Sequence, residues 1–79
     1  MTKPFLTIEL SPEKDAVDIH GDDEGLRRLI ERLESVLTSR QHEHLMTPSW
    51  GGSELSEELQ QPDDHLVHKL SIHLWPKRH

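Results

Sequence analysis

Histidine is the residue type in this sequence with the most scope for chemistry, because seven of the 79 residues are histidines. His42 and His44 stand two positions apart in HEHLM, so on a strand their imidazoles would share one face. If that segment pairs with the one carrying His73, three imidazoles could converge, as in an open zinc site. The HxH spacing is a weak signal, and the sequence has no HExxH motif. A zinc site of His42, His44 and His73 is therefore an alternative interpretation.

Other kinds of catalysis find less support in the sequence. There is no cysteine, which excludes disulfides, thiolate zinc sites and cysteine nucleophiles. Ser49 lies close in sequence to His44, but no GxSxG elbow is present. The acids of GDDEG, just before a predicted helix, would repel a phosphate, and there is no GxxxxGK. We therefore predict a protein that is not an enzyme and needs no cofactor, with Zn²⁺ considered only in the alternative interpretation.

The segment SWGGSELSEE, residues 49–58, combines a tryptophan, a glycine pair and several acids. The glycines permit positive φ angles and close backbone approach, so the segment could be a turn with Trp50 packed over the edge of the core. Alternatively, Trp50 anchors a partner, and an acidic rim steers a basic partner toward it. The partner-binding residues predicted on the second interpretation are Trp50, Glu54, Glu57, Glu58 and Trp75, with Asp63 and Asp64 as peripheral charges.

The elements that position these residues can be predicted from hydrophobic periodicity. FLTIEL (Phe5–Leu10) and AVDIH (Ala16–His20) alternate around the polar turn SPEKD, which predicts a β-hairpin. Asp22 or Asp23 can then cap a helix that ends near Arg40. The helix carries one apolar stripe, which we expect to lie in the core, formed by Leu26, Leu29, Ile30, Leu33, Val36 and Leu37.

The second half of the chain predicts two more strands. HEHLMT (His42–Thr47) has an ambiguous phase, because either Leu45 or the His44 and Met46 pair could face the core. HLVHKLSIHLW (His65–Trp75) predicts one long strand. The order β-β-α-β-β predicts a single α+β domain over residues 1–79, with one amphipathic helix on a small, mainly antiparallel sheet. The uncovered sheet face would expose Phe5, Val67 and Trp75, and we expect a homodimer to form through that face or through an edge strand.

Charge and hydropathy narrow the classes of partner. The chain has 15 acidic residues against nine Lys and Arg, a formal net charge of −6. Such a protein repels nucleic acid, and its charge suits a basic protein partner. The start, MTKPFLTIEL, is too short and polar for a secretory signal, and no apolar run approaches the roughly 20 residues of a membrane span. We therefore expect a cytoplasmic protein that binds neither nucleic acid nor membrane.

Three segments resemble the small bacterial immunity proteins of immunity protein family 32. They are IHGDDEGLRRLIERLESV, with a Gly before the helix, HEHLMTPSWGGSELSEE, and HKLSIHLWP with its closing LWP. The resemblance covers roughly Val17 to Pro76. It implies a cytoplasmic protein that neutralises a cognate toxin by binding it, and it supplies no catalytic residues. An acidic inhibitor of this kind would suit the phosphate-binding cleft of a basic nuclease. The alternatives are a small histidine-based metal-binding protein and a structural homo-oligomer subunit.

Overall fold

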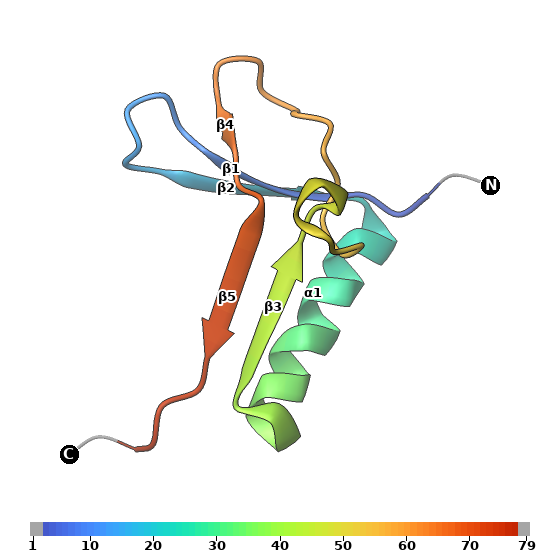
Figure 1. Cartoon of the computed structure of the whole chain (residues 1–79), viewed down its shortest axis with the longest axis vertical. Helices are drawn as coiled ribbons and strands as arrows, with labels where there is room; N and C mark the ends of the chain where they lie inside the picture. The colour runs from blue at the N-terminus through green and yellow to red at the C-terminus, as the bar shows by residue number, and fades with distance from the viewer. Residues whose placement is uncertain (1–2, 78–79) are drawn as a thin grey trace.

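The computed structural model describes residues 3–77 and shows an α+β fold with two small antiparallel sheets (Figure 1). One sheet has the strand order β2-β1-β4, and the other pairs β3 with β5. The helix α1 lies alongside β3. The elements are β1 (Leu6–Leu10), β2 (Val17–Gly21), α1 (Asp23–Ser35) with a final π turn (Val36–Arg40), β3 (His42–Met46), a 3-10 turn (Pro48–Trp50), β4 (His65–Leu66) and β5 (Lys69–His73).

The predicted hairpin and helix are confirmed, and local signals explain both. β1 and β2 pair in register from Leu6 opposite Gly21 to Leu10 opposite Val17. Asp22 is the helix N-cap, and its side chain accepts a hydrogen bond of 2.7 Å from the backbone of Gly25. The same carboxylate accepts from the Phe5 backbone at 3.2 Å, so the start of α1 is fastened to the start of β1.

The prediction of one long final strand is wrong, and with it the prediction of a single sheet. β4 pairs with β1, whereas β5 pairs with β3 in the second sheet. Between them, Val67 donates to the carbonyl of Ile8 at 2.8 Å, and the carbonyl of His68 accepts from Thr47 at 3.0 Å. The alternation is interrupted only at these two residues, where the apolar Val67 and the polar His68 exchange rows. Alternation records which side chains share a face and carries no information about the partner strand.

The apolar core lies between the two sheets. Leu6, Ile8, Leu45 and Leu55 form it, and Leu45 has no exposed surface. Leu45, and not the His44 and Met46 pair, therefore faces the core in β3. Val67 also packs against this core, and Trp75 lies beyond the end of β5. The exposed sheet face of Phe5, Val67 and Trp75 that we predicted for a homodimer is thus not formed.

Four of the six residues in the apolar stripe of α1 are exposed, which corrects the prediction that the whole stripe is core. Gly25 and Val36 are buried and Leu29 packs against the core. The other apolar residues form a second row, which is displaced by one residue in sequence and therefore by about 100° around the helix. The β3–β5 sheet has only two strands, about 5 Å apart, and is too narrow to cover both rows of a helix about 10 Å wide. The exposed row, with exposed fractions from 40% to 68%, is Leu26, Ile30, Leu33 and Leu37.

No helix in the part of the chain that the structure describes has both the length and the apolar character needed to cross a membrane. This finding agrees with the hydropathy of the sequence.

Candidate functional site

The ring of Trp50 is covered on one face by His68 and is otherwise largely exposed. It stacks on the imidazole of His68 with a centroid distance of 5.8 Å and an interplanar angle of 1°, yet 57% of the residue stays exposed. His68 is fixed in turn by a 2.7 Å hydrogen bond between its Nδ1 and the hydroxyl of the fully buried Thr47. Trp50 is therefore neither a plug in the core nor a free side chain, because one ring face is supported and the rest is available for contact.

The two glycines after Trp50 have different structural roles. Gly51 adopts a φ of 90°, in the left-handed region that favours glycine, and it ends the 3-10 turn. Gly52 passes so close to β3 that a Cβ atom there would lie 2.5 Å from the carbonyl oxygen of Met46. The prediction that this pair serves a positive φ and a close approach is confirmed, and both constraints hold the Trp50 turn against β3.

Glu57 and Glu58 are exposed and line a surface hollow of about 530 Å³. The hollow is also lined by Phe5, Pro48 and Leu55. Ser49, which is adjacent to Trp50, donates a hydrogen bond to the carboxylate of Glu57 and so links the aromatic turn to the acidic segment. Ser49 thus joins the turn of Trp50 to Glu57, and Glu58 lines the same hollow as Glu57; we call Trp50, Glu57 and Glu58 the Trp50 surface.

Glu54 faces inward and has a structural role. Its carboxylate accepts a 3.0 Å hydrogen bond from the backbone of Met46, and it lies 3.9 Å from the guanidinium of Arg32. Burial acts to raise the pKa of Glu54, but the backbone hydrogen bonds from Met46, Glu54 itself and Ser53, with the charge of Arg32, lower that pKa below its ordinary value. Glu54 supports the turn that carries Trp50.

Replacing Glu54 with glutamine is expected to lower the free energy of unfolding at pH 7 by about 1–2 kcal/mol, because a charged acceptor is lost. Since folding lowers the pKa of Glu54, its contribution is present above the ordinary value of 4.5 and is lost as the pH falls through the folded-state pKa. The difference between wild type and Glu54→Gln should therefore shrink below about pH 4.5 in urea titrations. Glu31→Gln, at an exposed helical position, is the control. A Glu54→Gln difference that is constant with pH would contradict this interpretation.

The remaining residues predicted for partner binding lie apart from the Trp50 surface or face elsewhere. Trp75 is 74% exposed and lines a small hollow with Gln41 and Leu74. It follows the end of β5, whereas Trp50 stacks on His68 before the start of β5. Asp63 is exposed, and Asp64, predicted as a peripheral charge, has only 9% of its surface exposed.

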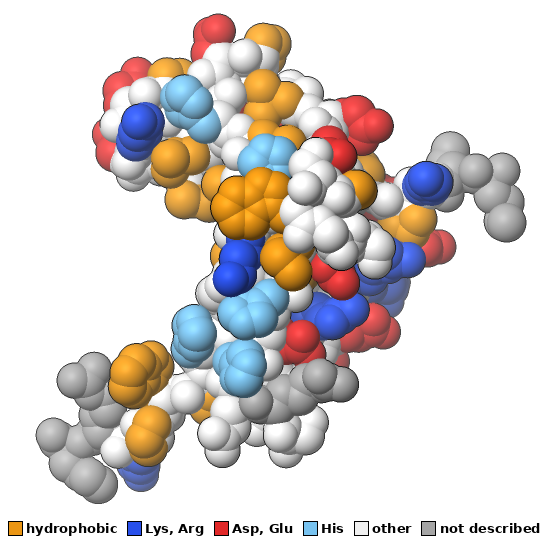
Figure 2. Space-filling view, in the orientation of Figure 1, with side chains coloured by type: hydrophobic (Ala, Val, Ile, Leu, Met, Phe, Trp, Pro, Cys, Tyr) orange, Lys and Arg blue, Asp and Glu red, His pale blue; other side chains and the backbone are white. Residues whose placement is uncertain are grey.

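The three histidines of the alternative zinc interpretation lie on one face of the β3–β5 sheet, where Figure 2 shows histidine side chains gathered. His42 is paired directly with His73 in the register. Ring centroids are 5.4 Å apart for His42 and His44, 6.4 Å for His42 and His73, and 6.5 Å for His44 and His73. His44 already shares a 3.0 Å hydrogen bond with the hydroxyl of Ser71. The three imidazole rings therefore lie close together, as the alternative interpretation requires. Their nitrogen atoms are not close enough to one another to bind one metal ion without movement of the side chains.

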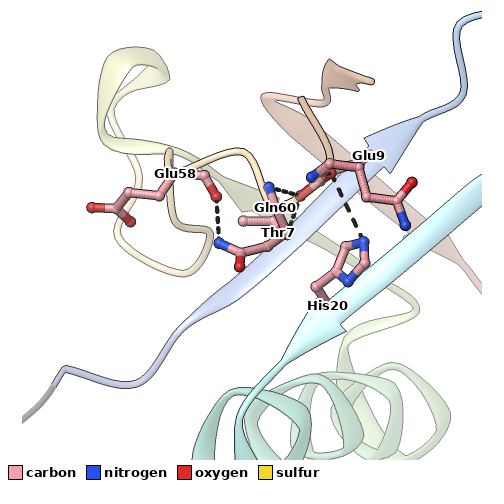
Figure 3. Close-up of polar contacts among 6 residues, drawn as sticks. Thr7, Glu9, His20, Glu58 and Gln60 are labelled. Atoms are coloured by element: carbon pink, nitrogen blue, oxygen red, sulfur yellow. Dashed lines mark hydrogen bonds and ion pairs between the residues drawn. The ribbon is translucent and has the colours of Figure 1, made fainter. Parts of the chain in front are cut away.

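The sequence reasoning missed a buried polar cluster of Glu9, His20 and Asp64 (Figure 3 shows Glu9 and His20). Glu9 is fully buried on the polar face of β1, and His20 lies on the same face of β2. One available signal was the hairpin register, which places a carboxylate and an imidazole on one face. The third member could not be found in this way, because Asp64 is more than 40 residues further along the chain.

Comparison with known proteins gives one match. A family model described as Immunity protein 32 matches residues 16–70. No curated protein matches the chain, and no solved structure does. The matched segment begins just before β2, includes α1 and β3, and ends within β5, so it contains the whole Trp50 surface.

Proposed function

The chain belongs to the immunity protein 32 family, and we propose that it neutralises a toxin by binding it directly, without catalysis. Family membership implies toxin neutralisation, and immunity proteins are typically inhibitors rather than enzymes. Direct binding, the surface used and the chemistry of the toxin are parts of the proposal.

The observation that carries the proposal is the supported yet exposed ring of Trp50, whose turn is linked through Ser49 to an exposed acidic segment. A tryptophan held on His68 loses little side-chain entropy when a partner covers it, which favours a binding hot spot. Glu57 and Glu58 are exposed and line one hollow, and Ser49, adjacent to Trp50, donates a hydrogen bond to Glu57. With a net charge of −6, the protein would attract a basic toxin, and the acids would orient it at the Trp50 surface.

The experiment is to co-express this protein with the product of the neighbouring gene, the candidate toxin. We expect growth to be restored and the two purified proteins to form a complex that elutes together in size-exclusion chromatography. The toxin should recover its activity when the complex is dissociated, because a bound inhibitor leaves its target chemically intact. Rescue accompanied by a covalently altered toxin would contradict neutralisation by binding.

The exposed row of α1 supports a second part of the proposal, association of two copies. Leu26, Ile30, Leu33 and Leu37 repeat at intervals of four, three and four residues, the spacing by which two helices pack along a shared seam. The same row on a second copy is self-complementary, as a two-fold symmetric interface requires. A homodimer would thus use the outer side of the helix rather than the sheet face expected from the sequence.

The double substitution Ile30→Glu with Leu37→Glu is expected to convert a dimer into a monomer, because it places four carboxylates in the symmetric seam. Both side chains are more than half exposed, at 55% and 68%, so folding should be retained. Sedimentation velocity at about 50 µM would measure the change, and Arg28→Glu on the polar face is the matched control. A wild-type mass equal to the monomer at this concentration would refute the dimer.

A second candidate function is zinc binding by His42, His44 and His73, which the ring distances of 5.4–6.5 Å favour. Imidazole nitrogens are common zinc ligands. Rotation of the exposed side chains of His42 and His73 could bring their nitrogens toward His44. Removal of all three should abolish one equivalent of Zn²⁺ in a calorimetric titration, and an unchanged stoichiometry would exclude this site.

A further inference from the structure

The two strands of the hairpin and a segment distant from them in sequence meet on the polar side of the first sheet. Glu9 comes from the central strand β1, His20 from the edge strand β2, and Asp64 from the connection that precedes β4. One potential ligand atom from each residue lies within 4.8 Å of those from the other two. Glu9 is fully buried, Asp64 is 9% exposed and His20 is partly buried, so the fold encloses most of this cluster.

The carboxylate of Glu9 is held rigidly by the connection that covers it (Figure 3). Its Oε2 accepts hydrogen bonds from the hydroxyl of Thr7 at 2.7 Å and from the backbone of Gln60 at 2.9 Å. Its Oε1 accepts from the backbone of Gln61 at 3.2 Å. Burial acts to raise the pKa of Glu9, but these hydrogen bonds and the nearby His20 lower it below its ordinary value. A buried, oriented carboxylate anion is the result.

The polar atoms facing Glu9 are not satisfied in the same way. His20 Nε2 and Asp64 Oδ2 are buried and have no hydrogen-bond partner among residues 3–77. Nε2 lies 3.8 Å from Glu9 Oε1, which is beyond hydrogen-bond distance. Unsatisfied buried polar atoms are uncommon in folded proteins, and a site for a bound ion is one of their ordinary explanations.

The negative charge of the carboxylates in this cluster also favours a bound cation. Burial, the neighbouring carboxylates of Asp18 and Glu9 and a side-chain hydrogen bond with Glu9 raise the pKa of Asp64 above its ordinary value, whereas His20 acts to lower it. Within the described part of the chain, His20 is the one basic side chain that pairs with this cluster, and no lysine or arginine does. A divalent cation would compensate both carboxylates and fill the coordination needs of the two unsatisfied atoms.

We propose that Glu9, His20 and Asp64 form a binding site for a divalent transition metal, with Zn²⁺ as the preferred ion. One imidazole nitrogen and two carboxylate oxygens are ligands that Zn²⁺ accepts, with a fourth position left for water. Metal–ligand distances near 2.1 Å place tetrahedral ligand atoms about 3.4 Å apart, so closure from 4.8 Å needs side-chain shifts of about 1 Å. The metal would join β1 and β2 to the connection of residues 51–64, which carries Glu57 and Glu58.

The test must separate this site from the histidines on the β3–β5 sheet. Isothermal titration of metal-free protein with ZnCl₂ is therefore carried out in a background of His42→Gln, His44→Gln and His73→Gln. We expect this variant to bind one equivalent of Zn²⁺, and its melting temperature to rise when Zn²⁺ is added. Adding Asp64→Asn, which keeps the side-chain shape, should weaken Zn²⁺ binding at least tenfold, as should adding His20→Gln.

Two further measurements keep the result interpretable. Far-UV circular dichroism confirms that each variant is folded, and if Asp64→Asn does not fold, His20→Gln provides the test. His65→Gln in the same background is the matched control, because His65 is exposed and adjacent to Asp64 but does not belong to the cluster. The proposal is overturned if the triple variant binds no Zn²⁺, or if its affinity is unchanged by both Asp64→Asn and His20→Gln. It is also overturned if His65→Gln alone removes binding.

Discussion

The combined substitution Trp50→Ala, Glu57→Gln and Glu58→Gln is expected to weaken toxin binding by on the order of a hundredfold or more. Truncating a central tryptophan anchor costs about 2 kcal/mol or more, and each 1.4 kcal/mol is tenfold in affinity. The exposed carboxylates should act mainly on the association rate and on its salt dependence. The effect on folding should be small, because Trp50 is 57% exposed and Glu57 and Glu58 lie on the surface.

Surface plasmon resonance with the toxin immobilised would separate the two contributions. Trp50→Ala alone should mainly raise the dissociation rate, and the two Glu→Gln changes should lower the association rate at low ionic strength. Glu13→Gln with Glu31→Gln removes the same number of charges from exposed positions away from the Trp50 surface, and it serves as the matched control. If the triple variant binds within threefold of wild type, the Trp50 surface is not the toxin interface. Trp75→Ala, tested separately, would show whether the interface reaches the other end of β5.

The second large effect is expected for Gly25→Ala, which should lower the free energy of unfolding by about 3 kcal/mol. At an ordinary position within a helix, Gly→Ala stabilises by about 1 kcal/mol, so the predicted sign is reversed. A Cβ atom on Gly25 would lie 1.8 Å from the carbonyl oxygen of Phe5 and 2.7 Å from its carbon. Both are backbone atoms and cannot rotate away, so the start of α1 must move off β1, with strain and lost capping contacts as the cost.

Thermal unfolding followed by circular dichroism would measure this effect. Since 1 kcal/mol corresponds to roughly 4–8 °C in a domain of this size, the melting temperature should fall by on the order of 10 °C or more. Arg28→Ala, at an exposed position of the same helix, should change it little. An unchanged or raised melting temperature for Gly25→Ala would show that the helix does not approach β1 as closely as the structure indicates.

Several features of the fold could be predicted because they depend on short stretches of chain. The hairpin follows from alternation around a polar turn, and the N-cap from the position of Asp22 before the apolar repeat. The glycines after Trp50 were assigned correctly, because a left-handed φ and a close backbone approach both favour residues without a side chain. The α+β class followed from the order of these elements.

The errors share a different origin. The final alternating segment is continuous in sequence but is divided between two sheets at Val67 and His68, because its halves pair with different strands. The apolar stripe of α1 is helical as predicted, but only one of its two rows meets the core. In each case the local pattern was recognised correctly, and the neighbour that should cover it was assigned incorrectly.

For the candidate sites, the sequence by itself determined which residues were available and which of them share a strand or a helix face. It also determined the family, through the segments that surround α1 and Trp50. Only the tertiary structure decided that Trp50 rests on His68 with its ring exposed, and that His42, His44 and His73 converge on one sheet face. It alone placed Asp64 beside Glu9 and His20. The physical reason is that hydrogen-bond periodicity and capping act within a few residues, whereas burial and the meeting of distant side chains depend on which surfaces the whole chain brings into contact.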